Sequence, residues 1–368
     1  MNCGANSAAS PVIPLRSDIS LIVDGLHRLN TRPLSVMEVC GTHTVSIFRS
    51  GIRSLLPPDL RLVSGPGCPV CVTDQGEIDA ALSLVEKGAI VATYGDMLKV
   101  PCDRGSLASK RSEGYDVAIV TSAMDVASLA EKHPDREVVF LAVGFETTSP
   151  ATAALVKEAE QRGVPNLSVL SLHKRTPPVL AVLAGDPGLK ISGFLLPGHV
   201  CVILGHEPFS FLPRDCGLPS VIAGFEGEQI LLGLAEILRQ DSRGESSLAS
   251  VYGRAVRPEG NEKARALLDE VFVSRSAPWR GIGVIPDSGY ALAERFGAFD
   301  AERRFSLTIE PGRSLPGCRC GDVLTGKITP PDCPLFRTAC TPLSPVGPCM
   351  VSSEGTCGAY FRFYKGDS

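Results

Sequence analysis

Short apolar runs rich in β-branched residues recur along the chain up to about residue 240, and they predict β-strands. The eight runs are residues 34–39, 60–64, 89–94, 116–121, 137–143, 167–172, 191–196 and 220–223. Amphipathic patterns with helical spacing lie between most of them. This alternation of strand and helix predicts an α/β fold in which parallel sheets are covered by helices on both faces.

Four segments have the apolar spacing of a single helix face, and they are residues 18–30, 75–87, 226–240 and 261–274. The second is preceded by Asp74, with Glu77 three residues later, which is the pattern of a capping box. The helix is therefore expected to begin directly after Asp74. Beyond residue 310 the chain is rich in Pro, Gly and Cys and poor in periodic apolar residues. We therefore expect something other than hydrophobic burial to hold it.

The eight predicted strands divide by chain order into two sets of four. The loop at residues 39–44, VCGTHT, is distantly similar to the loop at residues 143–150, VGFETTSP. We therefore expect two similar parallel-sheet domains that face a central cleft. The predicted divisions are an N-terminal segment and helix (1–30), a first α/β domain (31–133), a second (134–245), a helical connection (246–310) and a Cys-rich region (311–368).

Composition narrows the possible functions. The 36 basic and 40 acidic residues give a net charge of −4 without a basic block, which argues against nucleic-acid binding. No apolar run approaches the roughly 18 residues of a membrane span. The N-terminus lacks the basic start and apolar centre of a signal peptide, so a cytoplasmic location is expected. Thiols stay reduced there, and the 13 cysteines call for an explanation other than a structural disulfide framework.

Polar loops follow the predicted strands, and in open α/β sheets such loops converge on one cleft. The first, CGTHT, places Cys40 and His43 at the start of a helix. The positive end of the helix dipole should stabilise a thiolate and disfavour an imidazolium. A thiolate and a neutral imidazole suit a soft metal or a nucleophilic site. The alternative is an ordinary tight turn.

The second such loop, GPGCPVC, contains Cys68 and Cys71 in a CxxC motif just before a helix. This arrangement lowers thiol pKa and permits reversible closure to a disulfide. Half of a zinc site is the competing interpretation, but a zinc site needs a second pair of ligands, and none lies nearby in the sequence. A redox-active dithiol is therefore the preferred interpretation.

Six cysteines are concentrated near the C-terminus, at positions 318, 320, 333, 340, 349 and 357. A cubane iron–sulfur cluster needs four thiolates, which leaves two for redox chemistry. A structural zinc with two idle thiols remains the alternative.

Other polar residues in the post-strand loops are Asp96, Glu146, His173, Lys174, Arg175 and His199. Glu146 and His199 are the preferred site candidates, because Gly and Thr neighbours allow a ligand to approach closely. Lys174 or Arg175 is a candidate to bind an anionic ligand, although a helix N-terminus could serve the same purpose. Each of the six is equally explained as a loop residue that bonds to the backbone. The remaining cysteines, Cys3, Cys102, Cys201 and Cys216, are interpreted as ordinary small residues or free thiols.

The motifs MEVCGTHT, SGPGCPVCVT, TYGDMLKVP, GFETTSP and LPGHV occur in this order, followed by the tail CRCGDVLTGKITPPDCPLF. The sequence resembles the HypD family of hydrogenase maturation factors from about residue 18 to 364. The resemblance implies a cytoplasmic scaffold that joins the chaperone HypC. On this scaffold, iron would acquire two cyanides, delivered by HypE, and one carbon monoxide. The Fe(CN)2CO unit would then pass to the hydrogenase large-subunit precursor. For the fold, the resemblance implies two similar α/β domains and a [4Fe-4S] region.

The resemblance also implies roles for individual residues. Cys40 would bind the iron together with a HypC cysteine, with His43 as its neighbour, and Cys68 and Cys71 would form a reversible disulfide. The tail is similar to ferredoxin:thioredoxin reductase. That similarity implies a cluster on four cysteines, with the other two paired for redox chemistry. The ligands would be Cys318, Cys333, Cys340 and Cys357, and the pair would be Cys320 and Cys349.

Two other functions remain open at this point. One is a thiol–disulfide oxidoreductase that is supplied with electrons by its own cluster and acts on protein disulfides. The other is a zinc-stabilised interaction protein. The sequence contains no P-loop and no convincing GxGxxG fingerprint, so the chain is not expected to use ATP itself. An assembly scaffold with a redox-active dithiol is favoured over a conventional turnover enzyme.

Overall fold

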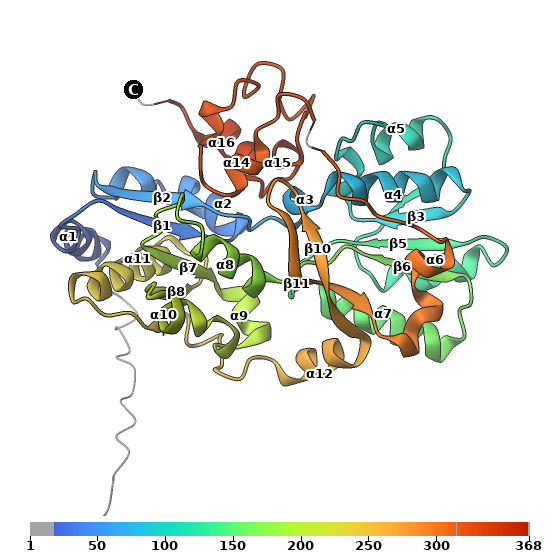
Figure 1. The fold of residues 1–368 in the computed structure, drawn as a ribbon, viewed down its shortest axis with the longest axis horizontal. Helices are drawn as coiled ribbons and strands as arrows, with labels where there is room; N and C mark the ends of the chain where they lie inside the picture. The colour runs from blue at the N-terminus through green and yellow to red at the C-terminus, as the bar shows by residue number, and fades with distance from the viewer. Residues whose placement is uncertain (1–17, 314, 367–368) are drawn as a thin grey trace, which may run out of the picture.

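The computed structural model describes residues 18–313 and 315–366. Two parallel β-sheets with helices on both faces lie side by side, and a Cys-rich C-terminal region lies over their junction (Figure 1). The fold class predicted from the sequence, α/β with two parallel-sheet units and a Cys-rich tail, is confirmed. Cys3 lies outside the described residues. Within the described ranges, no helix has the length and apolar character that a membrane span requires.

The first domain contains a five-stranded parallel sheet in the order β2-β1-β7-β8-β9. Its strands are β1 (Leu34–Glu38), β2 (Leu60–Ser64), β7 (Gly193–Pro197), β8 (Ser220–Ala223) and β9 (Leu248–Ser250). Apolar side chains of α1 and α11 form the core on one face, and those of α8, α9 and α10 pack on the other. The bounds are α1 (Ile19–Leu29), α2 (Gly41–Arg49), α8 (Thr176–Ala184), α9 (Gly198–Leu204), α10 (Phe211–Cys216) and α11 (Gly227–Ser242).

The second domain contains a four-stranded parallel sheet in the order β4-β3-β5-β6. Its strands are β3 (Ile90–Thr93), β4 (Val117–Ile119), β5 (Val138–Ala142) and β6 (Leu167–Ser171). Separate apolar clusters cover its two faces. The covering helices are α4 (Gln75–Glu86), α5 (Leu107–Ser112), α6 (Asp125–Lys132), α7 (Ser149–Arg162), α12 (Glu262–Val271) and α13 (Ala301–Arg304). The capping box of α4 forms between Asp74 and Glu77 as predicted.

The strand pairing corrects the predicted domain divisions. Strands β3 to β6 form one sheet, so the boundary predicted between residues 133 and 134 cuts through the second domain. The second sheet is inserted between β2 and β7 of the first. If the strands of each sheet are numbered in chain order, both sheets run 2-1-3-4 from one edge. This shared order agrees with the expectation of two similar domains, although one domain is built from discontinuous parts of the chain.

The predicted helical connection at residues 246–310 is also wrong in part. The helix predicted at 261–274 ends at Val271, and Phe272 begins an antiparallel hairpin of β10 (Phe272–Trp279) and β11 (Gly283–Leu292). The buried positions of β10 include Phe272, Ala277 and Trp279, and a register shift lies between Arg275 and Ala277. This irregularity hides the two-residue periodicity by which a strand is recognised.

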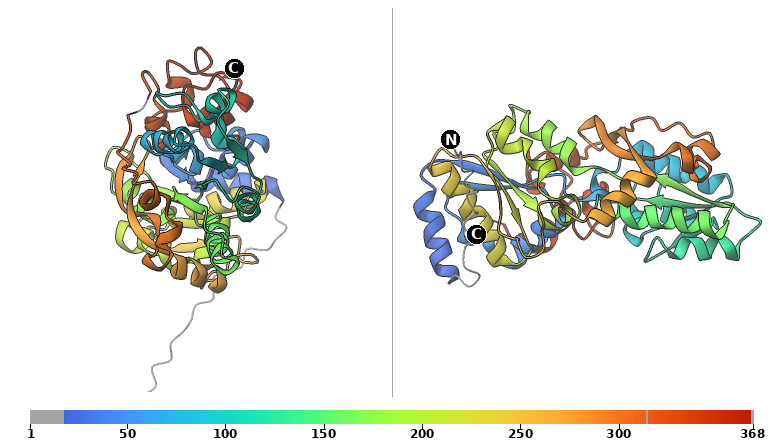
Figure 2. Two further views of the ribbon diagram at one scale, coloured as in Figure 1. Left: turned by 90° about the vertical axis from the view of Figure 1, so that its right-hand side faces the viewer. Right: turned by 90° about the horizontal axis from the view of Figure 1, so that it is seen from below.

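The C-terminal region contains α14 (Cys320–Leu324), α15 (Pro348–Val351) and α16 (Thr356–Phe363). Its apolar residues, among them Val323, Leu324 and Met350, belong to the same core as Met37 and Phe194 of the first sheet. Burial against the first domain therefore holds this region, which corrects the expectation that apolar packing is too weak there. The view from below shows the two domains as neighbouring lobes along the long axis, with the C-terminal region near their junction (Figure 2).

Short elements complete the structure. They are α3 (Pro69–Val72), and the 3-10 turns η1 (Ile52–Leu55), η2 (Gly95–Lys99), η3 (Glu207–Phe209), η4 (Glu294–Phe299) and η5 (Pro330–Asp332). The helix predicted after Cys40 is α2, which ends at Arg49, and η1 follows it directly.

Candidate functional site

The first site lies at the carboxyl ends of β1 and β7, which are neighbours in the first sheet. The chain leaves these two strands toward opposite edges of the sheet, and such a switch point is where open α/β sheets bind ligands. Cys40 follows β1, and His199 lies in the first turn of α9 after β7. The Cys40 Sγ atom lies 3.9 Å from His199 Nδ1. The structure therefore joins two predicted site residues that are far apart in sequence.

Burial governs the chemistry of Cys40. Its side chain is 2% exposed, and burial raises the pKa of the thiol to about 12, with the nearby Glu38 carboxylate acting in the same direction. The prediction that the helix N-terminus favours a thiolate is thus wrong for this state of the protein. A bound cation would reverse the balance, because metal binding releases the thiol proton.

Two histidines flank the Cys40 loop, and both are neutral. Burial lowers the pKa of His43 and of His199 to about 4, so each imidazole has a lone pair available for a metal. Nε2 of His43 lies 2.9 Å from the Gly224 carbonyl oxygen, and its buried Nδ1 has no hydrogen-bond partner. The Phe225 ring packs against both imidazoles, with centroid separations of 4.9 and 5.0 Å. Of the two, His199 is the one whose imidazole contacts the Cys40 sulfur.

Cys68 and Cys71 are joined by a disulfide, and both are buried. Their loop is bonded directly to the Cys40 loop. The Gly41 N–H donates to the Gly67 carbonyl at 3.1 Å, and a Cβ on Gly67 would lie only 2.2 Å from the Cys40 nitrogen. Glycine is therefore required for this close approach. The disulfide-bearing loop and the Cys40 loop form one packed unit.

The C-terminal region completes this unit. Its helix α15, which contains Cys349, packs against α3, which contains Cys71. The Thr42 hydroxyl donates to Glu354 Oε1 at 2.7 Å, and Gly41 packs directly against the Glu354 backbone. Three Cys-containing stretches that are far apart in the chain are thus packed against one another.

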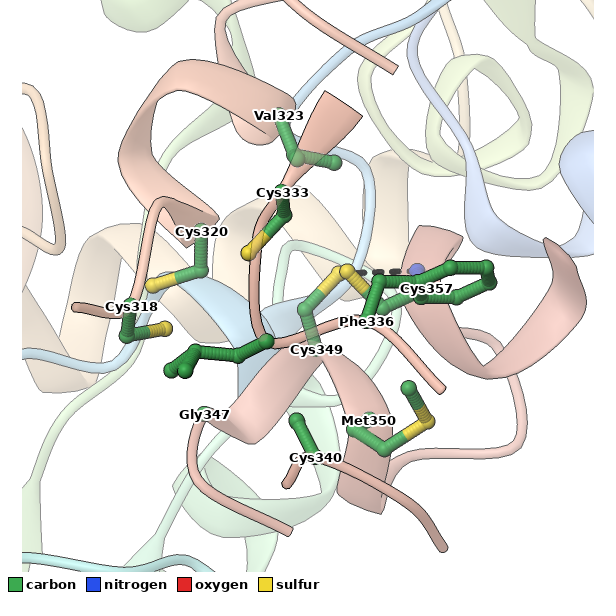
Figure 3. A pocket seen from close by; sticks show the side chains of 11 residues that line it. Cys318, Cys320, Val323, Cys333, Phe336, Cys340, Gly347, Cys349, Met350 and Cys357 are labelled. Carbon is green, nitrogen blue, oxygen red and sulfur yellow. Dashed lines mark hydrogen bonds between the residues drawn. The ribbon is translucent and has the colours of Figure 1, made fainter. Parts of the chain in front are cut away.

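All six cysteines of the tail line one cavity (Figure 3). Apolar side chains, including Val323, Leu335, Phe336 and Met350, form the rest of its wall. A set of thiols in an apolar cavity fits an iron–sulfur cluster, whose ligands are cysteine thiolates. Within the described residues, no three His, Cys, Asp or Glu side chains are grouped as a ready site for a metal ion.

The sulfurs of the cavity interact in two pairs. A hydrogen bond from Cys320 lowers the pKa of Cys318 to about 6, and one from Cys357 lowers the pKa of Cys349. The Cys357 N–H also donates to Cys349 Sγ at 3.2 Å. The structure therefore groups Cys318 with Cys320 and Cys349 with Cys357. The division implied by the family resemblance, in which Cys320 pairs with Cys349, stays a prediction.

The remaining predicted residues are engaged in internal contacts. Glu146 accepts hydrogen bonds from the Thr176 N–H and hydroxyl at 2.6 and 2.7 Å, and burial raises its pKa. Lys174 forms a buried ion pair with Glu77. The others contact a hydroxyl or carbonyl oxygen: His173 with Thr152, Arg175 with Asp287 and Asp96 with Ser352. These contacts support the structural alternative for all five.

Several site residues were not identified from the sequence. Glu38 accepts the Cys40 N–H at 3.0 Å and the Thr44 hydroxyl. Phe225, just after β8, packs against His43 and His199, and Glu354 of the tail accepts a hydrogen bond from Thr42. Arg280, from the turn of the β10–β11 hairpin, is buried beside the connection after α3. Glu38 lies within the quoted MEVCGTHT motif, but no sequence signal placed Arg280 near a cysteine.

Comparison with known proteins agrees with this arrangement. A profile described as HypD, "Hydrogenase formation hypA family", matches residues 18–364. The chain is 44% identical over 348 residues to the "Hydrogenase maturation factor HypD" of Cupriavidus necator, covering 91% of this chain and 92% of the relative. It is 40% identical over 339 residues to the protein of the same name from Escherichia coli, covering 92% and 91%.

A third relative gives the same result. The "Putative hydrogenase expression/formation protein" of Methanocaldococcus jannaschii is 41% identical over 352 residues, which cover 95% of this chain and 98% of that protein. The match extends over both sheets and the Cys-rich tail. The chain therefore belongs to the HypD family and is a hydrogenase maturation factor.

Proposed function

We propose that this protein is a scaffold on which the iron of a nickel–iron hydrogenase receives its diatomic ligands, and that its thiols and an iron–sulfur cluster supply redox chemistry. Cys40 anchors the iron as a thiolate, with His199 beside it and a cysteine of HypC as the second sulfur ligand. Thiolate sulfur and neutral imidazole are both donors that iron accepts. The iron carrying two cyanides and one carbon monoxide is cargo, which passes to the hydrogenase large-subunit precursor.

One observation carries this proposal: the Cys40 loop, with His199 3.9 Å from its sulfur, packs directly on the loop of the Cys68–Cys71 disulfide. A metal anchor and a two-electron couple thus lie next to each other. Reduction of the disulfide consumes two electrons and two protons and yields two thiols. A dithiol at this position is suited to deliver electrons to chemistry at the neighbouring iron.

The cavity of the tail is the source of those electrons in this proposal. Four of its six cysteines hold a [4Fe-4S] cluster, with Cys318, Cys333, Cys340 and Cys357 as the assignment implied by the resemblance. Cys320 and Cys349 are then the redox pair that transfers electrons toward Cys68 and Cys71. Packing of α15 on α3 supports this order, because it places the Cys349 helix against the Cys71 helix. The cluster, when bound, supplies one-electron chemistry.

The proposed setting is the cytoplasm, with HypE as the donor of cyanide to the complex with HypC. His43 is proposed as a support of the iron site rather than a direct contact of the Cys40 sulfur. Its Nε2 is hydrogen-bonded to the Gly224 carbonyl oxygen, while its buried Nδ1 is free to accept a hydrogen bond or to bind a metal.

The test is anaerobic co-purification with HypC, followed by iron analysis and infrared spectroscopy for CN and CO stretches. Wild-type protein should show these bands, and Cys40→Ala should lose them while it keeps the brown colour of the cluster. Cys216→Ser, which alters an exposed thiol in α10, is the matched control and should keep the bands. Bands absent from the wild type, or equally strong in Cys40→Ala, would contradict the proposal.

A thiol–disulfide oxidoreductase is the second candidate, and the disulfide next to a Cys-rich cavity is the observation that favours it. Burial of that disulfide argues against attack by the thiols of another protein, since Cys68 is 3% and Cys71 0% exposed. An oxidoreductase should keep its turnover in Cys40→Ala, whereas a scaffold should lose its iron cargo.

A further inference from the structure

Arg280 is a buried cation at the end of the β10–β11 hairpin. The residue is 2% exposed. Its Nε donates to the Thr73 carbonyl at 2.8 Å, and its Nη1 donates to Gln75 Oε1 at 3.1 Å. Both partners lie just beyond the Cys68–Cys71 disulfide, and the Arg280 N–H also donates to the Val72 carbonyl at 3.0 Å. The arginine is therefore attached to the segment that carries the disulfide.

The guanidinium has no carboxylate partner. Among the described residues no Asp or Glu forms an ion pair with Arg280, in contrast to buried Lys174, which pairs with Glu77. In addition, Nη2 of Arg280 and Nε2 of Gln75 are buried and have no hydrogen-bond partner. A buried charge without a counter-charge is costly. The position thus calls for a negative group that is not an acidic side chain.

The hairpin turn that contains Arg280 packs against the tail beside its first two cysteines. The backbone of the hairpin turn touches the C-terminal region at the residue after Cys320, where a Cβ on Gly281 would lie 2.1 Å from the Gly321 Cα. Arg280 therefore lies between the disulfide-bearing segment and the first two cysteines of the cavity.

We propose that Arg280 is the counter-charge of the sulfur site: its guanidinium offsets the negative charge of a thiolate-bound iron–sulfur cluster in the cavity and raises the reduction potential of that cluster. The inference rests on the proposed function, because it assumes that the cavity holds such a cluster. Arg280 is a positioning residue. It acts on the cluster through its charge and is linked by hydrogen bonds to the segment that receives the electrons.

The physical reason is the charge change on reduction. The cluster gains one electron, no bond forms or breaks, and the negative charge of the site increases by one. A fixed cation nearby stabilises the reduced state more than the oxidised state, and the cavity wall screens it little. Removal of the cation should therefore make the cluster harder to reduce.

The test is a redox titration of the anaerobically purified full chain with dithionite, followed by electron paramagnetic resonance. Arg280→Gln should disfavour reduction at least tenfold in the equilibrium constant, a shift of about 59 mV or more to negative potential for a one-electron couple. Gln75→Glu keeps the guanidinium in place and puts a carboxylate beside it, so it should shift the potential in the same direction. This second variant keeps the proposal testable if Arg280→Gln fails to fold.

Arg275→Gln is the matched control, because Arg275 lies on the same hairpin but already pairs with Glu302. It should leave the potential unchanged, and Arg280→Lys, which keeps the charge, should shift it less than Arg280→Gln. An unchanged potential in cluster-containing Arg280→Gln or Gln75→Glu overturns the inference and leaves the proposed function standing. An equal shift in Arg275→Gln also overturns it. If the wild-type protein contains no iron and sulfide, the result instead rejects the cluster that the proposed function assumes.

Discussion

The Cys40 sulfur and the His199 imidazole face each other at 3.9 Å, although 159 positions separate the two residues in the chain. Each follows a strand of the first sheet, and these strands are hydrogen-bonded neighbours. The contact is thus produced by sheet topology rather than by local sequence. Neither group bears a charge in this state, because burial raises the pKa of the thiol and lowers that of the imidazole.

This contact predicts a role for His199 in iron retention. His199→Ala should reduce the iron held at Cys40 by about 10-fold to 100-fold, the usual effect of losing a group that supports a metal ligand. The measurement is iron content after dialysis against a chelator, together with the CN and CO infrared bands. His206→Ala changes a half-buried histidine after α9 and should retain the iron. Equal retention in both variants would show that His199 does not support the site.

Gly67 predicts a steric requirement at the junction of the two loops. In Gly67→Ala the added methyl group would overlap the Cys40 backbone, and overpacking of this kind costs about 1–3 kcal/mol. The free energy of unfolding should fall by that amount, and iron retention should fall with it. Gly25→Ala in α1 is the control, because nothing lies within 4 Å of its Cβ, and it should stabilise the protein by about 0.5–1 kcal/mol. A Gly67→Ala protein as stable as the wild type contradicts the close approach.

Glu38 predicts a pH dependence. Burial raises its pKa from an ordinary 4.5 to about 7 in the folded protein. Between these values the folded state holds a proton that the unfolded state has released, so stability falls as pH rises through this window. Residue 38 cannot ionise in Glu38→Gln. The stability of this variant relative to the wild type should therefore rise from about pH 4.5 to 7 and then stay constant. Thermal unfolding of both proteins across this range is the measurement, and a difference independent of pH would reject the assignment.

The buried Lys174–Glu77 ion pair predicts that losing one partner costs far more stability here than in an exposed pair. Both side chains are 1% exposed, and Lys174→Met would leave the Glu77 carboxylate buried and unpaired, at a cost of about 3–5 kcal/mol. Lys157→Met removes a partner of Glu270 from a partly exposed pair and should cost about 0–1 kcal/mol. Chemical denaturation of the two variants tests this contrast. Similar losses would mean that the buried pair is not a specific support of the second domain.

Much of the fold follows from local patterns. All eight predicted strands form, and β2 and β8 have the predicted bounds, because continuous apolar runs between turn residues are typical of buried parallel strands. The helix after Asp74 also begins where its capping box predicts. Local patterns did not predict the insertion of one domain into the other, because the pairing of β1 with β7 depends on contacts between residues far apart in the chain.

The sequence identified site residues where a short motif indicates a known chemistry. It did not predict the properties that depend on burial of a side chain. The CxxC motif and the Cys-rich tail identified the disulfide and the cavity. The protonation of Cys40 was predicted incorrectly, because the helix dipole is visible in a sequence while desolvation of the thiol is not. Arg280 was missed for a related reason: an arginine near a tryptophan gives no signal until the fold shows that it is buried without a carboxylate.

The insertion of the second domain has a mechanical consequence. The chain leaves the first sheet through residues 65–74, which include the Cys68–Cys71 disulfide, and returns through residues 172–175, which include Lys174. Any rotation of one sheet against the other must therefore twist the backbone that carries the disulfide. Breaking or forming that bond changes the stiffness of this connection, so electron transfer at the two sulfurs and the relative orientation of the domains are coupled through it.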